Sequence, residues 1–111
     1  MTYNCQITDY FRKRLKKLIK KDPGLKENLI ETLNNFKKEE SIALGGGIYK
    51  LRMKRDGGGK SGGFRLLVLV EENTKQLAPI IIYPKSARQN LTHKEINHHL
   101  ENIKAELSLY T

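Results

Sequence analysis

Two segments in the first third of the chain place hydrophobic residues at helical spacing. The first runs from about Thr8 to Lys21, with Thr8 as its expected N-cap, and the second runs from about Leu25 to Lys38. Between them, Asp22-Pro23-Gly24 is a strong stop signal, so the pattern predicts an antiparallel pair of helices. The expected apolar stripes are Phe11, Leu15, Leu18 and Ile19 in the first helix, and Leu25, Leu29, Leu33 and Phe36 in the second.

After the glycines at 45–47, which interrupt the helical region, the hydrophobic period changes to two from Ile48, as in a β-strand. Residues 56–63 then predict a glycine-rich hairpin loop, residues 64–70 a central strand and residues 77–83 a third strand. Pro79 within the third strand requires an edge, a bulge or a missing ladder bond. In the first strand, Tyr49, Leu51 and Met53 fall on one face, and Lys50, Arg52 and Lys54 on the other.

A final helix is expected to start near Thr92, which forms a T-x-x-E capping box with Glu95. The whole pattern predicts one α+β domain over residues 1–111: an N-terminal α-hairpin, a three-stranded antiparallel meander and a C-terminal helix. The single cysteine, Cys5, excludes an internal disulfide, and no apolar run is long enough to cross a membrane. We therefore expect a cytoplasmic protein without a membrane partner.

The net charge of +9 is concentrated in residues 41–70, which carry six Lys or Arg against one Asp or Glu. Like charges gathered in one segment repel each other, so a polyanionic partner, above all RNA, is the favoured interpretation. A solvated surface that only sets solubility is the alternative. Gly59-Lys60-Ser61 is not a nucleotide-binding P-loop, because that motif needs a glycine where Lys54 stands and a helix where a strand follows.

Metal and cofactor chemistry is not predicted. His93, His98 and His99 lie on one expected helix without the spacing of a metal site, and there is no C-x-x-C motif. Metal-free cleavage of RNA fits the positive cluster better, because the 2′-hydroxyl of RNA is itself the nucleophile. Cations stabilise the extra charge on the phosphate, and lysines crowded by other cations can transfer protons. The candidates are Lys50, Arg52, Lys54, Arg65 and Lys85.

Three stretches give the chain a resemblance to the RelE/HigB superfamily of toxin–antitoxin toxins. They are Gly-Gly-Gly-Ile-Tyr-Lys-Leu-Arg-Met-Lys from Gly45, Gly-Gly-Phe-Arg-Leu-Leu from Gly62, and Ile-Tyr-Pro-Lys-Ser-Ala-Arg-Gln-Asn-Leu-Thr from Ile82. The resemblance covers nearly the whole chain and implies a RelE-like microbial RNase fold. It also implies a ribosome-dependent mRNA endonuclease whose partners are the ribosome, mRNA and a cognate antitoxin.

The resemblance carries over to single residues. Lys50 and Arg52 match two basic strand positions, Arg65 matches the phosphate-contacting arginine of a glycine-aromatic-arginine motif, and Lys85 matches a basic position after the third strand. Ser86 and Thr92 stand where the best-known member has an arginine and a catalytic tyrosine. The predicted catalytic residues are Arg65, Lys85, Lys54 and Arg52, and the predicted RNA-binding residues are Lys50, Lys60, Tyr83 and Arg88.

Within this assignment Arg52 and Arg65 clamp the phosphate, and Lys54 or Lys85 transfers protons. Tyr83 is equally compatible with a place in the core and with stacking on a base. Two alternative functions stay open. One is a ParE-like toxin of the same fold that poisons DNA gyrase, and the other is an RNA-binding module without catalytic activity.

Overall fold

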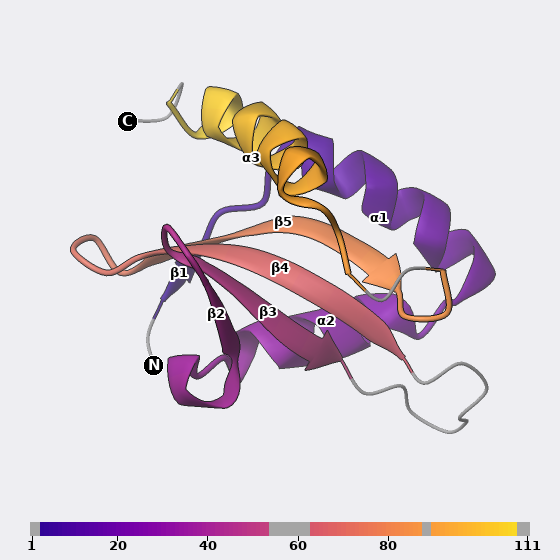
Figure 1. The fold of residues 1–111 in the computed structure, drawn as a ribbon. Helices are drawn as coiled ribbons and strands as arrows, with labels where there is room; N and C mark the ends of the chain where they lie inside the picture. The colour runs from indigo at the N-terminus through magenta and orange to yellow at the C-terminus, as the bar shows by residue number, and fades with distance from the viewer. Residues whose placement is uncertain (1–2, 54–62, 88–89, 109–111) are drawn as a thin grey trace.

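The computed structural model describes residues 3–53, 63–87 and 90–108. Its helices and strands form a five-stranded mixed sheet in the order β1-β5-β4-β3-β2, with helices on both faces (Figure 1). In chain order the elements are β1 (Asn4–Cys5), α1 (Asp9–Lys21), α2 (Leu25–Asn34), the 3-10 helix η1 (Lys38–Glu40), β2 (Ile42–Gly45), β3 (Ile48–Met53), β4 (Phe64–Glu71), β5 (Gln76–Pro84) and α3 (His93–Leu107).

The predicted helices are present, with one difference in length. The Thr8 side chain accepts a hydrogen bond from the Phe11 amide and caps α1. The Thr92–Glu95 capping box starts α3, as the sequence predicts. The prediction for the second helix is wrong at its end, because α2 stops at Asn34 and the chain then turns through η1. This early end lets Phe36, which lies beyond α2, pack into the core.

The predicted meander β3–β4–β5 forms the centre of the sheet, and two edge strands that the sequence pattern does not predict complete it. The short β1 pairs with β5 in parallel, and β2 pairs with β3 in an antiparallel hairpin. The triple glycine is the turn of this hairpin, and its three residues all have positive φ. A Cβ on Gly47 would come within 2.9 Å of the Val70 carbonyl oxygen, so the hairpin crosses β4 too closely for a side chain there.

Pro79 lies beside a bulge, one of the three arrangements expected for a proline within this strand. Val68 pairs with Pro79 and the preceding Leu67 pairs with Ile81, so Ile80 is the extra residue on β5. The pairs between β1 and β5 stop at Leu77, and therefore Pro79 has a strand neighbour on the β4 side alone. A proline without an N–H donor is tolerated at such a position.

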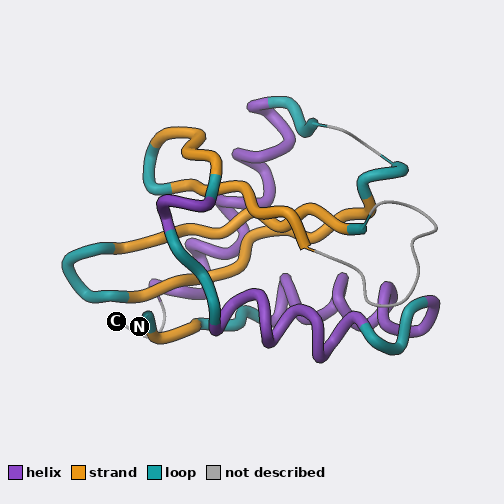
Figure 2. The backbone as a smooth tube through the Cα atoms, turned by 90° about the horizontal axis from the view of Figure 1, so that it is seen from below, coloured by secondary structure: helices purple, strands orange, loops and turns teal. Residues whose placement is uncertain are grey.

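The sheet separates two hydrophobic cores. Residues of α1 and α2, which run alongside each other, pack on the face that carries Leu51, Met53 and Leu66 (Figure 2). Residues of α3 pack on the opposite face, with Ile103 fully buried against the cluster that contains Leu67. On β3, Lys50 lies on the face of the sheet on which α3 packs, because it lines one cavity with residues of α3.

The position of α3 is fixed by polar contacts with α1. The Glu106 carboxylate accepts hydrogen bonds from the backbone amides of Asp9 at 2.7 Å and Tyr10 at 2.9 Å, at the N-terminus of α1. A carboxylate is favourable there because the first helical amides lack intrahelical partners. The Tyr10 hydroxyl also lies 2.6 Å from His99 Nδ1, which joins the two helices a second time.

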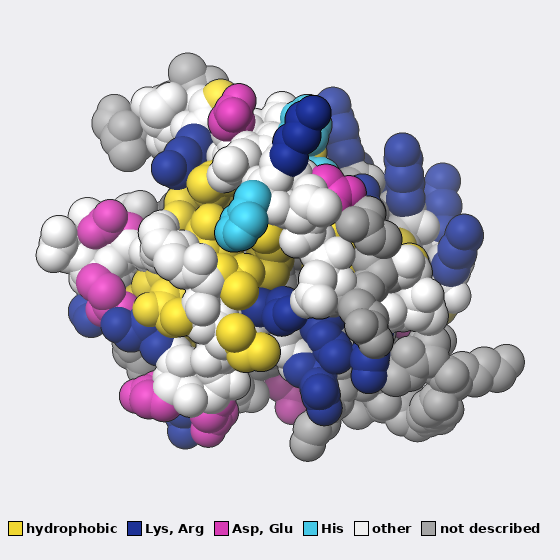
Figure 3. All heavy atoms as spheres, in the orientation of Figure 1, with side chains coloured by type: hydrophobic (Ala, Val, Ile, Leu, Met, Phe, Trp, Pro, Cys, Tyr) yellow, Lys and Arg dark blue, Asp and Glu magenta, His cyan; other side chains and the backbone are white. Residues whose placement is uncertain are grey.

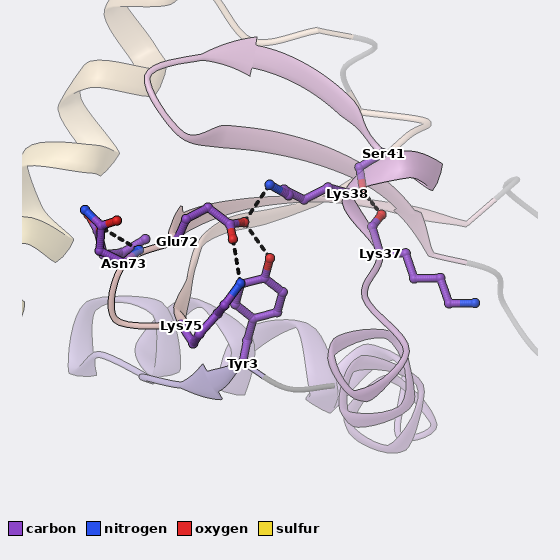
Figure 4. Close-up of polar contacts among 8 residues, drawn as sticks. Tyr3, Lys37, Lys38, Ser41, Glu72, Asn73 and Lys75 are labelled. Atoms are coloured by element: carbon purple, nitrogen blue, oxygen red, sulfur yellow. Dashed lines mark hydrogen bonds and ion pairs between the residues drawn. The ribbon is translucent and has the colours of Figure 1, made fainter.

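A carboxylate in the β4–β5 turn joins three further segments. Glu72, in the β4–β5 turn, accepts a hydrogen bond from the Tyr3 hydroxyl at 2.5 Å and pairs with Lys38 at 2.7 Å and Lys75 at 2.9 Å (Figure 4). These three donors, the hydrogen bond from Lys38 first, lower the pKa of Glu72 to about 2. The network connects the N-terminal segment, η1 and the turn.

Candidate functional site

The strand register brings basic residues of neighbouring strands to one face of the sheet. Arg65 on β4 lies directly opposite Arg52 on β3, and on its other side it lies opposite Tyr83 on β5. Lys50, two residues before Arg52, faces the same side. The alternation of β3 is present, with Leu51 and Met53 buried and Arg52 between them exposed.

Three of the predicted site residues line one small pocket of about 280 Å³. Among the described residues its walls are Lys50, Arg65, Lys85 and Asn90, which bring three cations and no carboxylate. The Lys50 ammonium donates a hydrogen bond of 2.9 Å to the Asn90 side-chain oxygen. This contact holds the lysine, and no described carboxylate in the pocket neutralises its positive charge. We call this the cationic pocket.

Arg65 is the most constrained cation of the cationic pocket. Its Nη1 atom is buried and has no hydrogen-bond partner among the residues that the structure describes. A buried donor without a partner destabilises the fold, and more so when it belongs to a charged group. An oxyanion bound in the pocket would satisfy this donor, since guanidinium groups form strong hydrogen bonds with phosphate.

Arg52 occupies a different environment from the other candidates. It is exposed and lines a second depression, of about 410 Å³, together with acidic residues that include Glu31 and Glu40. It lies opposite Arg65 in register but does not line the cationic pocket. Like charges directly opposite each other in a sheet repel, so the pair Arg52–Arg65 adds to the local excess of positive charge.

Tyr83 is buried, with 3% of its surface exposed, and packs in the core below α3. This position favours the core role over stacking on a base, although Tyr83 also lines the larger cavity described next. Three other predicted residues, Lys54, Lys60 and Arg88, lie outside the described residues.

A larger cavity of about 470 Å³ adjoins the cationic pocket between α3 and the sheet. The two share Lys50 and Asn90 as lining residues. Hydrophobic side chains line much of the larger cavity, and Figure 3 shows them at the surface below α3, with Lys and Arg side chains directly beside them. The edge strand β2 adds to this apolar surface with Ile42 and Leu44, which are 58% and 38% exposed.

The histidines of α3 do not form a metal site. Within residues 3–53, 63–87 and 90–108, no group of three His, Cys, Asp or Glu side chains is arranged to hold a metal ion. Burial, together with the positive charge of Arg14, lowers the pKa of His99, which contacts the Tyr10 hydroxyl. His99 therefore serves the packing of α3 on α1. Among the described helices, none has the length and apolar character to cross a membrane.

Asn90 is the site residue that sequence reasoning missed. It lies 40 residues from Lys50, and the contact between them depends on how the chain after β5 folds back over the sheet. The only signal in the sequence is its position between Lys85, at the end of the third strand, and the helix cap Thr92.

Comparisons with known proteins identify a family and a fold. Residues 8–110 match the family described as the RelE toxin of the RelE/RelB toxin–antitoxin system. Among solved structures, a mutant of the E. coli toxin RelE in the free state is similar, with a TM-score of 0.51, 19% sequence identity, and coverage of 80% of this chain and 90% of that one. At this identity the likeness shows the fold alone. No curated protein matches the sequence.

Proposed function

Since this chain belongs to the RelE family of toxins from toxin–antitoxin systems, we propose that it is a ribosome-dependent, metal-independent mRNA endonuclease that inhibits translation. Membership of the family makes it the toxin component and gives it an antitoxin as partner. The cleavage of mRNA and the need for the ribosome are the parts that we propose.

The observation that carries the proposal is the buried Nη1 atom of Arg65, which has no partner among the described residues and lies in a pocket with two lysines and no carboxylate. Such an arrangement lowers stability in the free protein, and a bound phosphodiester would satisfy it. Preorganised donors of this kind stabilise charge that develops in a transition state. The pocket therefore suits phosphoryl chemistry better than simple adhesion to RNA.

The proposed reaction uses the 2′-hydroxyl of the substrate. Its oxygen attacks the adjacent phosphorus as its proton is removed, the bond from phosphorus to the 5′-oxygen breaks, and that oxygen gains a proton. The products are a 2′,3′-cyclic phosphate and a 5′-hydroxyl. We assign Arg65 and Lys50 to stabilising the charge on the pentacovalent phosphate and Lys85 to proton transfer; the shared pocket of the three residues supports this assignment. Lys54 stays the second candidate for proton transfer, and Arg52 would bind the flanking backbone.

The antitoxin is expected to neutralise this charge. An acidic or amphipathic segment that covers the face with Lys50 and Arg65 would exclude RNA by charge complementarity and by occupying the pocket. No cofactor or membrane takes part in the proposal.

The test is to express the wild-type protein, Arg65→Ala and Arg12→Ala from an inducible promoter in a bacterial host. The 5′-hydroxyl ends on translated mRNA are then mapped for each. Arg12 is the matched control, because it is an exposed arginine of α1 paired with Asp9. We expect cleavage within reading frames by the wild type and the control. Arg65→Ala should cleave about 10²–10³-fold more slowly, as when one preorganised donor is removed from an oxyanion site.

Two results would overturn the proposal. Growth arrest with intact mRNA and covalent gyrase–DNA adducts would identify a gyrase poison. Binding of RNA without any cut would identify a binding module, whose affinity should fall steeply with salt because it rests on phosphate contacts.

A further inference from the structure

We infer that the cavity between α3 and the sheet binds one nucleobase of the RNA, next to the phosphate held in the cationic pocket. This inference deepens the proposed function and rests on it. It assigns to the toxin itself a part of the sequence preference at the cut, in a cavity that adjoins the cationic pocket and shares Lys50 with it.

Continuity with the cationic pocket is the first argument. Lys50 and Asn90 line both spaces, and their hydrogen bond of 2.9 Å stands at the boundary. A nucleotide whose phosphate contacts Arg65 therefore has the larger cavity on the other side of this pair. Figure 3 shows the same relation on the surface, where the hydrophobic area below α3 adjoins the Lys and Arg side chains.

Size and shape give the second argument. The cavity volume of about 470 Å³ lies within the range of roughly 300–1,000 Å³ that small-ligand sites occupy. Its walls come from opposite sides, with Ile48 and Leu67 on the sheet and Ile96 and Leu100 on α3. Two apolar walls suit a flat aromatic ring, because both faces of the ring leave water.

The polar residues of the cavity give the third argument. Asn90, His93 and Asn97 line it together with the apolar walls. Side-chain amides read the edges of bases by paired hydrogen bonds, and unstacked bases of single-stranded RNA are recognised by stacking plus such contacts. An apolar segment of a partner protein would offer no hydrogen-bond partner to the exposed side chains of His93 and Asn97. The combination of apolar walls and amides therefore favours a base.

The inference predicts which substitutions change recognition without touching catalysis. Asn97→Leu removes an exposed amide from the cavity, and Leu100→Phe fills part of its volume. His98→Leu is the matched control, because His98 is the next residue on α3, is exposed and does not line the cavity. None of the three belongs to the cationic pocket.

The first experiment is NMR titration of the whole protein with uncleavable dinucleotides that lack the reacting 2′-hydroxyl, and with an abasic sugar phosphate. We expect the abasic compound to shift signals of the residues that line the cationic pocket, and not those of Asn97 or Leu100. The dinucleotides should also shift the Asn97 side-chain amide and the Leu100 methyl groups, by amounts that depend on the base. In Leu100→Phe the base-dependent affinity should fall roughly tenfold, the low end of what a good base contact contributes.

The second experiment maps cut sites on translated mRNA for the same variants. Asn97→Leu should reduce the base preference at one nucleotide beside the cut by roughly tenfold, and His98→Leu should retain the wild-type preference. Dinucleotide shifts identical to those of the abasic compound, or a cut-site preference unchanged in both cavity variants, would overturn the inference while leaving the endonuclease intact. NMR shifts of Asn97 and Leu100 that appear only when the antitoxin is added would likewise overturn the inference. Base-dependent binding without any cleavage by the wild type would instead refute the proposed function and leave the base site standing.

Discussion

Replacement of Arg65 by methionine isolates the energetic effect of the buried cation. Methionine keeps an unbranched apolar stem of similar length, but it has no donor and no charge. The change removes a buried nitrogen that lacks a partner among the described residues, and it ends the repulsion with Arg52 directly across the strand pair. We therefore expect Arg65→Met to be more stable than the wild type and inactive.

The magnitude follows from two contributions. An unsatisfied buried donor costs about 1–3 kcal/mol, and like charges directly opposite in a sheet add about 0.2–1 kcal/mol. Part of this gain is lost because the Arg65 side chain is partly exposed and its charge is hydrated there. We expect a net increase in the free energy of unfolding of about 1–2 kcal/mol. For a domain of this size each kcal/mol raises the Tm by roughly 4 °C.

The assay is urea and thermal unfolding in a buffer of low ionic strength without phosphate. Arg52→Met is the control, because it removes the same charge from an exposed side chain and leaves the buried nitrogen in place. The free energy of unfolding of Arg52→Met should change by less than about half of the change in Arg65→Met. Added inorganic phosphate should raise the Tm of the wild type and not that of Arg65→Met, because an anion that binds only the folded state stabilises it.

A loss of stability in Arg65→Met would refute the reasoning, since it would mean that the guanidinium group is satisfied in the folded protein. Equal gains in Arg65→Met and Arg52→Met would also refute it. Such equality would assign the effect to general charge repulsion and not to the buried atom.

Two further predictions concern the fold. The pKa of Glu72 is lowered to about 2 from its ordinary 4.5; stability from its contacts is thus fully present above about pH 5 and is lost as the pH falls toward 2. Tm measured across this range should fall less steeply in Glu72→Gln than in the wild type. Gly47→Ala should unfold at lower urea than Gly46→Ala, because both have positive φ but only Gly47 would place a Cβ 2.9 Å from the Val70 carbonyl oxygen; equal midpoints would contradict the close approach.

Helices and strands could be predicted from the sequence where their buried residues follow a simple period. The stripe of α1 and the alternation of β3 each put apolar residues on one side, so their boundaries could be predicted closely. In β2 all four residues are exposed, and β1 has only two residues, so neither strand leaves a burial pattern to detect. The premature end of α2 reflects tertiary packing of Phe36, which helical spacing alone cannot distinguish from another turn of helix.

The same limit applies to the site. The cations of the cationic pocket could be predicted because alternation and the glycine-aromatic-arginine motif identify Lys50 and Arg65. The different environments of Arg52 and Arg65 could not be predicted. The burial of Arg65 and the position of Arg52 in a separate depression both depend on side-chain packing. Asn90 has no such local pattern, and its role follows from a contact across 40 residues.

The attachment of α3 to α1 also determines the order in which the molecule can be completed during synthesis. The hairpins of β3, β4 and β5 join neighbouring segments, and local contacts of this kind form early. The contact of Glu106 with the start of α1 spans 97 residues and must wait for the last helix to leave the ribosome. A nascent chain can thus present its basic strands before the wall contributed by α3 exists. The cavity beside them is complete only once the C-terminal helix has docked.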